Sequence, residues 1–441
     1  MIKLKLRILS LFERLIQVYF IQLLSFKRLL HISKSEKITT NSIVVFNTYD
    51  LGGGAAKIAR QLTVFFKDTH LIRLYVKIKK SKENWIHTIQ SKQYSYLEEV
   101  LRRESVKKGW IEFTGFHALS LMEDSFFKAS SIVHLHNLHG EFFSPILFKS
   151  LFKGKKVIWT LHDESFITGH CSCTLGCNQW LRGCGNCPDL NIYPAVSYDN
   201  TKAVLEYKKK WITALQPVVV SPSHWLANRV RLSYPELNNI EVIPNGVDVK
   251  LFYPQDKIKI RKILDFPIDK KIVLFVAEFA TQNPFKGGFI FRDILSDPFF
   301  SDLIFITVGG KQETSFTNHV SYPYITDEIE LSKLYAACDV LLYPTQADNL
   351  PLVVLESMAC GTLVIASNVG GIPEIINEYN GFLIEEYENS NEFKHKLKTF
   401  IELDEIELKE KQENARSTIV NDFNFDKMTS CYQQLYCSIH T

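Results

Sequence analysis

The sequence predicts an α/β protein built on parallel sheets, and three observations support this. A strand, a loop, a helix and a second strand follow one another within residues 339–378. A second strand pattern, 42–47, runs directly into three glycines and a small-residue helix start. The chain has 441 residues, 46% of them hydrophobic and 22% charged, which suits two or three globular domains. In such proteins ligands bind at the carboxyl ends of the strands, so we expect the site in the loops that follow them.

The clearest of these units begins with an apolar, β-branched run at 339–343. Polar residues 346–349 follow, and we expect a helix to open at Leu350 and Pro351 and to stop at Gly361 before a strand at 362–367. Proline suits a first helical turn, where its missing N–H is not needed. The loop before the helix directs unpaired amides and a positive dipole end at its ligand, which favours an anion such as phosphate.

Two acidic residues flank this helix start. Asp348 stands at its mouth and Glu356 lies inside the helix, eight residues later. Because a carboxylate accepts two hydrogen bonds at once, Glu356 could hold the vicinal diol of a ribose while the amides hold a diphosphate. A strand, helix and strand with one buried acid could equally belong to any other α/β domain.

The acidic pair resembles that of the family 4 retaining glycosyltransferases, nucleotide-sugar enzymes of the GT-B architecture, although most of them carry Glu where this chain has Asp348. The segments ADNLP, LESMACGT and VGGIPEII look most like the bacterial branch that builds exopolysaccharide, capsule and O-antigen, of which the colanic-acid enzymes are typical. The resemblance covers about 42–380. It implies transfer of a sugar, with retention, from a UDP- or GDP-sugar to a glycan or lipid-linked acceptor hydroxyl, without a catalytic metal.

The resemblance also implies a domain plan, in which two doubly wound Rossmann-like domains face a central cleft. We expect an acceptor domain at 40–215, with a cysteine-rich insertion at 169–188, and a donor domain at 216–410. A terminal helix at 411–441 would return to the first domain.

Residues 1–39 read as a basic amphipathic helix. They carry eight Lys and Arg and two Glu, a net charge of +6 in a chain whose total is +3. Between Arg14 and Lys27 lie only twelve uncharged residues, fewer than the roughly 20 that a membrane-spanning helix needs. We expect residues 1–30 to lie on an anionic membrane surface or to pack on the protein itself. No secretory cleavage site follows, so the expected location is the cytoplasm, with the helix on the inner face of the plasma membrane, and the small net charge argues against nucleic acid.

The glycine triplet Gly52, Gly53 and Gly54 follows the strand at 42–47. Glycines in that place allow a ligand to approach the backbone closely, although a triplet is also a common tight turn. The loop resembles the first loop of the same transferases, beside the donor phosphate and the acceptor.

Two strand ends carry histidines. The strand at 156–161 ends in His162 and Asp163, and the resemblance implies that His162 contacts a sugar hydroxyl while Asp163 orients it or meets the acceptor. The strand at 132–136 is followed by His139 and contains His134 and His136, which we expect to be ordinary core or surface residues.

Five cysteines fall within seventeen residues: Cys171, Cys173, Cys177, Cys184 and Cys187. Without an export signal the compartment is expected to be reducing, where clustered cysteines more often hold metal than form disulfides. We predict a structural zinc ion on Cys171, Cys177, Cys184 and Cys187, with free thiols or disulfides as the alternative.

The second half opens with a strand at 271–277 and a loop that reaches Lys286. Family members usually carry an Arg after this strand and a basic pair before the glycine. Here Glu278 or Ala280 stands at the Arg position and Phe285 replaces the first basic residue, so only Lys286 is left to neutralise the leaving phosphate. By the resemblance, the remaining donor contacts come from Asp348, Asn349, Leu350, Pro351 and Glu356.

Three other functions fit the sequence. A nucleotide-sugar epimerase could have the same two-domain shape, and the missing Arg would suit a non-catalytic glycan-binding relative. The cysteine cluster would suit a zinc-dependent redox or interaction protein.

Overall fold

The computed structural model describes residues 42–89, 92–310 and 316–440. They form two compact units, one up to Val220 together with Arg229–Glu241, and one comprising Ser221–Asn228 and the chain from Val242 onward. The predicted helix at 1–39 lies outside the described residues. Within the described ranges, no helix combines the length and the apolar character needed to cross a membrane.

The first unit is built on a sheet whose described strands run in the order β3-β2-β1-β4-β5-β6-β7. Their bounds are β1 Ser42–Tyr49, β2 Leu71–Ile78, β3 Ile86–Thr88, β4 Ile132–Leu135, β5 Lys156–Thr160, β6 Val218–Ser221 and β7 Ile240–Val242. Strand β1 pairs in parallel with both β2 and β4, so that Val45 lies opposite Leu74 and His134. The strand order therefore reverses between β1 and β4, and the loops after these two strands leave the sheet side by side.

The helices of the first unit connect these parallel strands. They are α2 Gly53–Phe66, α3 Lys92–Lys107, α4 Ser125–Ala129, α5 Phe148–Leu151 and α6 Thr201–Leu215, with 3₁₀ turns η1 Phe116–Met122, η2 Pro145–Leu147, η3 Glu164–Phe166 and η4 Gln179–Arg182. The core beneath them is rich in aromatic rings. Phe46 of β1 packs edge to face on Phe143 at 5.0 Å and on Phe127 at 6.1 Å between ring centroids, geometries that stabilise aromatic pairs.

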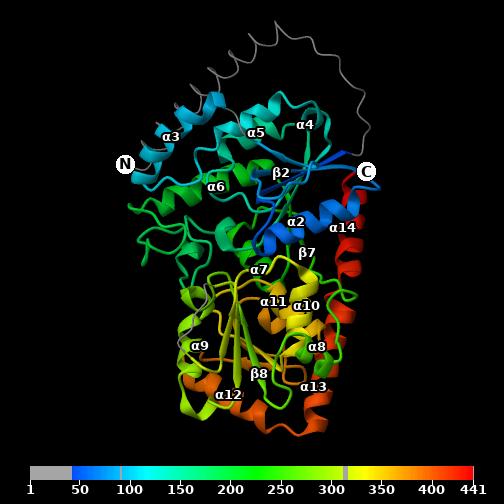
Figure 1. The fold of residues 1–441 in the computed structure, drawn as a ribbon. Helices are drawn as coiled ribbons and strands as arrows, with labels where there is room; N and C mark the ends of the chain where they lie inside the picture. Colours follow the sequence, from blue (N-terminus) through cyan, green and yellow to red (C-terminus); the bar gives the residue numbers. More distant parts are fainter. Residues whose placement is uncertain (1–41, 90–91, 311–315, 441) are drawn as a thin grey trace, which may run out of the picture. The chain divides into compact units, whose positions relative to one another are not determined.

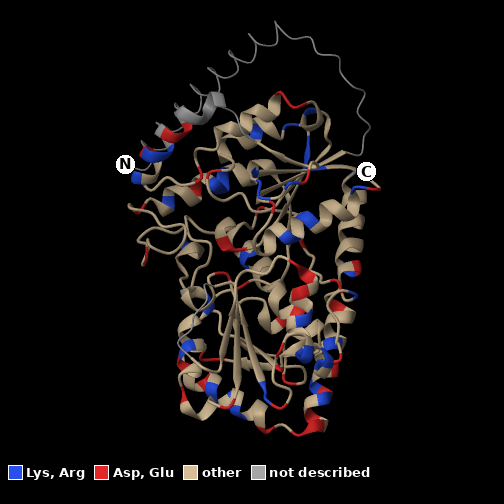
Figure 2. Ribbon diagram, viewed as in Figure 1, with Lys and Arg blue, Asp and Glu red and all other residues tan. Residues whose placement is uncertain are grey.

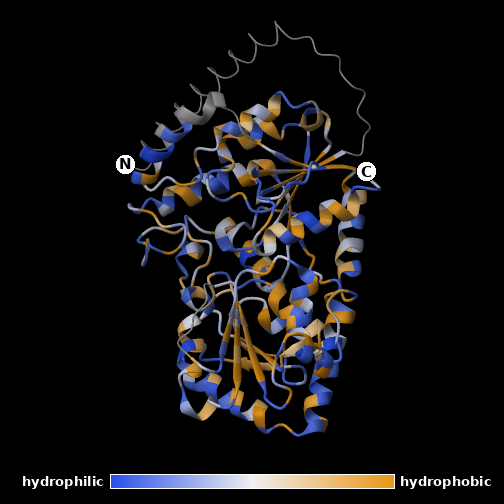
Figure 3. Ribbon diagram, viewed as in Figure 1, coloured by the Kyte–Doolittle hydropathy of each residue, from blue (hydrophilic) through white to orange (hydrophobic). Residues whose placement is uncertain are grey.

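The second unit repeats the same topology in the order β10-β9-β8-β11-β12-β13, with every adjacent pair parallel. Its strands are β8 Ile272–Val276, β9 Ile304–Val308, β10 His319–Tyr322, β11 Val340–Tyr343, β12 Leu363–Ser367 and β13 Phe382–Ile384. These strands are almost wholly apolar because both faces of the sheet are covered, as Figure 3 shows around β8. The order reverses between β8 and β11, and the loops after both strands converge there.

Helices cover the second sheet on both sides, with α9 and α12 on one side of β8 and α10, α11, α8 and α13 on the other (Figure 1). Their bounds are α8 Lys257–Ile263, α9 Gly288–Leu295, α10 Glu328–Ala337, α11 Leu352–Ala359, α12 Ser390–Glu402, α13 Glu405–Asp422 and α14 Phe425–His440, with α7 His224–Ser233 beginning in this unit and 3₁₀ turns η5 Ala280–Gln282, η6 Pro284–Lys286, η7 Pro298–Phe300 and η8 Ile372–Glu374. Charged residues gather on the outer helices, most clearly along α13 (Figure 2).

The predicted α/β class and its two doubly wound sheets are confirmed, and the predicted strands end within two residues of the observed ones. One boundary was wrong. Helix α11 begins at Leu352, because Pro351 is extended, with ψ 124°, and only precedes the helix. Gly361 does end it in the left-handed region, with φ 74°. The return of the terminal helix to the first unit stays a prediction.

A buried ion pair anchors the start of β11. The carboxylate of Asp339 accepts hydrogen bonds from Arg261 at 2.6 Å, from Lys257 at 2.9 Å and from the backbone N–H of Ile272 at 2.7 Å. Burial would raise the pKa of Asp339, but the two cations outweigh burial and hold it below its usual value. The group therefore stabilises the fold above the unfolded pKa of about 3.9, and this contribution is lost as the pH falls through the lower folded value.

We expect Asp339→Asn to lower the free energy of unfolding by about 3 kcal/mol at pH 7, because it leaves Arg261 buried and unpaired. Urea unfolding measures the loss, and the difference from wild type should shrink as the pH falls below about 4. Asp302→Asn is the control, since Asp302 pairs with Lys270 at 3.1 Å but its side chain is 93% exposed. Equal unfolding midpoints for the Asp339 and Asp302 variants would contradict this role.

Candidate active site

In the second unit, the loop after β8 packs against the end of β11. A Cβ added at Gly287, whose φ is 70°, would lie 1.9 Å from the carbonyl oxygen of Pro344. The N–H of Gln346 donates to the carbonyl of Phe285 at 2.8 Å. Only glycine fits at position 287, and this close contact brings Lys286 to the end of β11.

Lys286 forms an ionic cluster with Asp348 and Tyr343. Its ammonium group contacts the Asp348 carboxylate directly and lies 3.2 Å from the Tyr343 hydroxyl, which donates to the same carboxylate at 2.5 Å. Burial would lower the pKa of Lys286, but Asp348 and then Tyr343 raise it above its usual range, so Lys286 is cationic. Lys286 and Asp348, each predicted as a donor contact, thus contact each other. Tyr343, the last residue of an apolar strand, was missed because strand patterns do not separate a core tyrosine from a site tyrosine.

The loop that precedes α11 is held rigidly. The side-chain oxygen of Asn349 accepts from the Ser223 hydroxyl at 2.5 Å, and Asn245 donates to the carbonyl of Leu350 at 2.9 Å. These bonds keep 349–350 out of the helix, which explains why α11 starts later than expected. The Asn349 side chain is buried, and among the described residues its Nδ2 has no hydrogen-bond partner.

Glu356 is 3% exposed inside α11 and accepts a hydrogen bond from the Tyr335 hydroxyl at 3.0 Å. A buried carboxylate retains capacity for further donors. The expected position inside the helix is thus as observed, and its proposed contact with ribose remains a prediction.

A further acid caps the neighbouring helix α7. The carboxylate of Glu374 accepts from the backbone N–H groups of His224 at 2.9 Å and Trp225 at 2.7 Å, while the Ser223 hydroxyl accepts from Leu226 at 3.1 Å. Ser223 and Glu374 together cap this helix. The Glu374 carboxylate therefore stabilises the positive N-terminal end of α7.

In the first unit, the glycine loop leads into α2. Gly52 and Gly53 have φ values of 96° and 77°, which glycine adopts without strain, and Gly54 lies within the first turn of the helix. The glycines thus form a left-handed entry to α2, and their contact with a donor stays a prediction.

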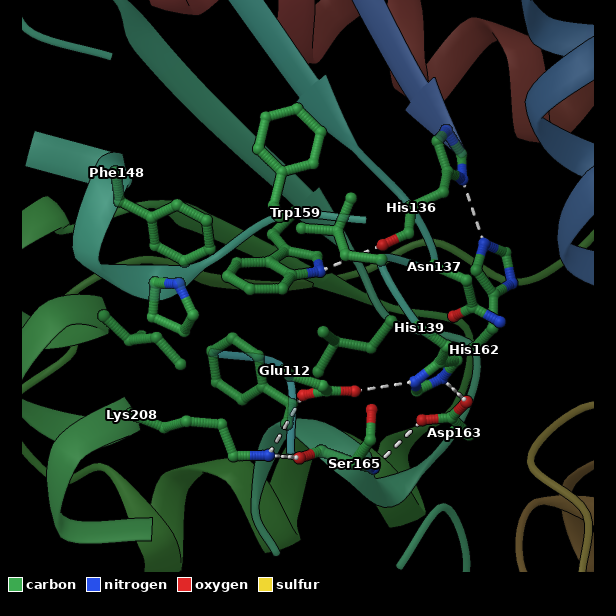
Figure 4. A pocket seen from close by; sticks show the side chains of 16 residues that line it. Glu112, His136, Asn137, His139, Phe148, Trp159, His162, Asp163, Ser165 and Lys208 are labelled. Atoms are coloured by element: carbon green, nitrogen blue, oxygen red, sulfur yellow. Dashed lines mark hydrogen bonds and ion pairs between the residues drawn. The ribbon is translucent and has the colours of Figure 1, made fainter. Parts of the chain in front are cut away.

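A pocket in the first unit gathers the histidines that follow β4 and β5 (Figure 4). Nδ1 of His136 and Nε2 of His162 are 2.9 Å apart, and Nε2 of His134 lies 2.8 Å from the Thr160 hydroxyl. Burial lowers the pKa of His162 to about 4 and of His134 to about 3, and lowers that of His136 well below 6.5. All three rings are therefore neutral, and one of His136 and His162 donates to the other.

Asp163 forms an ion pair with His139. Its Oδ2 lies 2.6 Å from Nε2 of His139, and its Oδ1 accepts from the N–H of Ser165 at 2.9 Å. Nδ1 of His139 lies 3.1 Å from Glu112. His139 is largely buried between two carboxylates contributed by distant loops, which is compatible with the expected core residue.

The cysteine-rich segment forms a pocket of its own. Cys171, Cys177, Cys184 and Cys187 line it together with His170, whose Nε2 lies 3.3 Å from the Cys187 sulfur. Burial raises the pKa of Cys171 to about 12 and raises that of Cys184 and Cys187. The thiols are free, and within the described ranges no three potential ligands stand close enough together to hold a metal ion. The side chains as described thus do not form the predicted zinc site.

Residues 256–418, which contain Lys286 and the entire segment around α11, match the family described as Glycosyl transferases group 1. These residues are similar to a group 1 glycosyl transferase domain. A protein of Escherichia coli K12 is named for glycosyl transfer in colanic acid biosynthesis. It is 28% identical to this chain over 270 residues, which are 58% of this chain and 64% of that protein. The resemblance to glycosyltransferases of the colanic-acid type is thus confirmed. An Escherichia coli UDP-Gal:alpha-D-GlcNAc-diphosphoundecaprenol alpha-1,3-galactosyltransferase is 28% identical over 221 residues, 46% of this chain and 55% of that enzyme. The chain spans less than two thirds of the length of both relatives.

Solved glycosyltransferases share the GT-B fold with this chain. Sucrose-phosphate synthase of Thermosynechococcus elongatus superposes with a TM-score of 0.66 at 18% identity, covering 90% of this chain and 99% of that one. Anabaena Alr3699/HepE, solved in complex with UDP-glucose, gives a TM-score of 0.60 at 15% identity over 90% of this chain and all of its own. The predicted GT-B class is confirmed by these folds.

The loop of the group 1 domain that carries Asp348 depends on a close backbone contact with Gly370. A Cβ at this residue, whose φ is 62°, would lie 1.7 Å from the carbonyl oxygen of Asp348. We expect Gly370→Ala to cost about 3 kcal/mol of stability in urea unfolding, since it must displace this backbone as well as adopt a left-handed conformation.

Gly361→Ala is the matched control, because Gly361 has a similar φ of 74° but a Cβ there would meet only Pro254, at 3.4 Å. It should cost about 1 kcal/mol. Equal losses for the two variants would mean that the contact with Asp348 is unimportant.

Proposed function

We propose that the chain is a retaining glycosyltransferase that moves a sugar from a UDP-sugar to a hydroxyl of a glycan or lipid-linked acceptor in cell-surface polysaccharide synthesis. The observation that carries this proposal is the cationic Lys286, held with Asp348 and Tyr343 at the point where the strand order of the group 1 domain reverses. A diphosphate is the ligand whose charge suits a lysine and a helix start at that place.

The donor would be held by the second unit. Lys286 would neutralise the charge that builds on the leaving diphosphate, and the backbone amides of the loop at Asn349 and Leu350 would donate to it or to the sugar. Glu356, buried one turn inside α11, would accept from the ribose hydroxyls, and Asp348 would accept from the sugar. Support for uridine as the base comes from the galactosyltransferase relative, whose name specifies UDP-Gal.

In the reaction, the bond between the anomeric carbon and the diphosphate oxygen breaks, and a bond to the acceptor oxygen forms on the same face of the sugar. The acceptor proton passes to the departing phosphate, so no side chain is needed as a nucleophile. The first unit would hold the acceptor, with His162 and Asp163 contacting sugar hydroxyls.

A lipid-linked acceptor is supported by the same relative, which is named for a diphosphoundecaprenol substrate. We propose that the basic residues 1–30 bring the enzyme to the cytoplasmic face of the membrane where such an acceptor resides.

We expect Lys286→Ala to lower kcat by about 10²-fold or more, because the charge on the leaving diphosphate is then uncompensated. The measurement is UDP release and glycosylated product from a panel of UDP-sugars, with product NMR reporting the anomeric configuration. Lys394→Ala is the control, since Lys394 contacts two carboxylates, Asp293 at 2.9 Å and Asp297 at 3.1 Å, on the outer helices. Wild-type turnover by Lys286→Ala would contradict the proposal, and inversion of configuration would remove the retaining mechanism.

We also propose that the four cysteines of the insertion take up zinc after a local rearrangement, since they already line one pocket. Metal analysis of the purified protein should give about one zinc per chain, and Cys184→Ser should release it together with part of the thermal stability. Cys437→Ser, at an exposed and isolated cysteine, is the control. Zinc-free wild-type protein with unchanged stability would exclude the metal.

A further inference from the structure

Four side chains from separate parts of the first unit form a continuous row in its pocket (Figure 4). Asp163 lies 2.6 Å from His139, His139 lies 3.1 Å from Glu112, and Glu112 lies 3.7 Å from the ammonium group of Lys208. Lys208 closes the row, because it donates to the backbone carbonyl of Ser165 at 2.8 Å, in the turn that Asp163 caps. Each group is thus fixed by a neighbour on either side.

The charges of the row balance. Burial would lower the pKa of His139, but Asp163 and Glu112 raise it to about 10, so the imidazole is protonated. In turn, although burial opposes it, His139 holds the pKa of Asp163 at about 2, and Lys208 and His139 lower that of Glu112. Two carboxylates and two cations therefore alternate along the row.

Glu112 is held in this row by a strained backbone. Its φ of 61° is left-handed, a conformation that non-glycine residues rarely adopt. The carboxylate of Glu141 compensates by accepting from the N–H groups of Glu112 and Thr114, both at 3.1 Å. Such strain persists only where the surroundings impose it, and it is characteristic of functional sites.

Asp163 is the member of the row that is most open to a ligand. Its side chain is 24% exposed, against 14% for His139 and 18% for Glu112. The Asp163 carboxylate accepts from His139 and from the backbone and hydroxyl of Ser165, and a carboxylate with three donors still has a lone pair for a further one. Asp163 is therefore placed to accept a hydrogen bond from a ligand hydroxyl. Its orientation is set by His139 and Ser165.

We propose that Glu112 and His139 are positioning residues, which hold Asp163 ionised and in one rotamer so that it binds a hydroxyl of the acceptor sugar. The inference rests on the proposed function, because that function places the acceptor at Asp163 and His162. Neither Glu112 nor His139 is expected to touch a substrate. Their removal should therefore affect the use of the acceptor and leave donor binding unchanged.

We expect Glu112→Gln to lower kcat about tenfold and to raise the acceptor KM, while the donor KM changes less than about twofold, as for other residues that orient a ligand-binding group. The second readout is independent of activity. In ¹⁵N-histidine NMR, His139 of the wild type should stay protonated to pH 9, whereas in Glu112→Gln it should titrate at a lower pH, because one of its two carboxylates is gone.

Three titratable groups face His139: Glu112, Asp163 and the neutral ring of His162. Lys208 acts on His139 through Glu112, and the Tyr193 hydroxyl lies near both carboxylates. His139→Gln assigns the NMR signal, and it is the second variant should Glu112→Gln fail to fold. Glu98→Gln is the matched control, because it breaks a similar bond of 2.7 Å, to His117, in the same unit. It should leave kcat and the His139 signal unchanged.

Three results would overturn the inference: a wild-type His139 that titrates near pH 6.5, a Glu112→Gln enzyme with wild-type acceptor kinetics, or an equal effect of Glu98→Gln. A wild type that transfers no sugar from any UDP-sugar would instead refute the proposed function. In that case the row would be judged by the NMR titration alone.

Discussion

The reversal of strand order is the constraint on which both candidate sites depend. In a doubly wound sheet, the loops after the two central strands run to opposite faces, and a crevice opens between them. In the second unit these strands are β8 and β11, and their loops carry Lys286 and Asp348. In the first unit the loops after β1 and β4 carry the glycines and His139. The chemistry of each site thus follows from topology before any single side chain is considered.

Charge compensation is the second theme common to the two units. Asp348 is neutralised by Lys286 and further bound by Tyr343, and Asp163 is neutralised by His139 and further bound by the Ser165 amide. In each case an acid in the loop after a buried strand is paired with a cation from another loop. A ligand that enters either site meets a carboxylate whose position is already determined.

No Arg directly follows β8 in this chain, and Lys286 is the cation that the loop after β8 supplies instead. The backbone at Phe279 and Ala280 is in the left-handed region, with φ values of 64° and 42°. This turn leads into η5 and η6, and Lys286 at the end of η6 reaches the end of β11. The pKa of Lys286 is raised, so this side chain is a permanent cation. A single well-placed charge, supported by the amides before α11, is the electrostatic element on which the proposed transfer relies.

The amino-acid sequence by itself determined the central strands β1, β4, β5, β8, β11 and β12, the glycine turns and the group 1 segment. Those features depend on local periodicity and on backbone preferences that a few neighbouring residues express, as Gly361 and Gly52 illustrate. It also predicted Lys286, Asp348 and Glu356 as site residues, from the resemblance of two separate segments to a known family. The tertiary structure alone decided where α11 begins, because Ser223 and Asn245 hold the preceding loop from more than a hundred residues away. It alone brought Glu112 and Asp163 to His139 across 27 and 24 residues, since contacts of that separation leave no periodic trace in the chain.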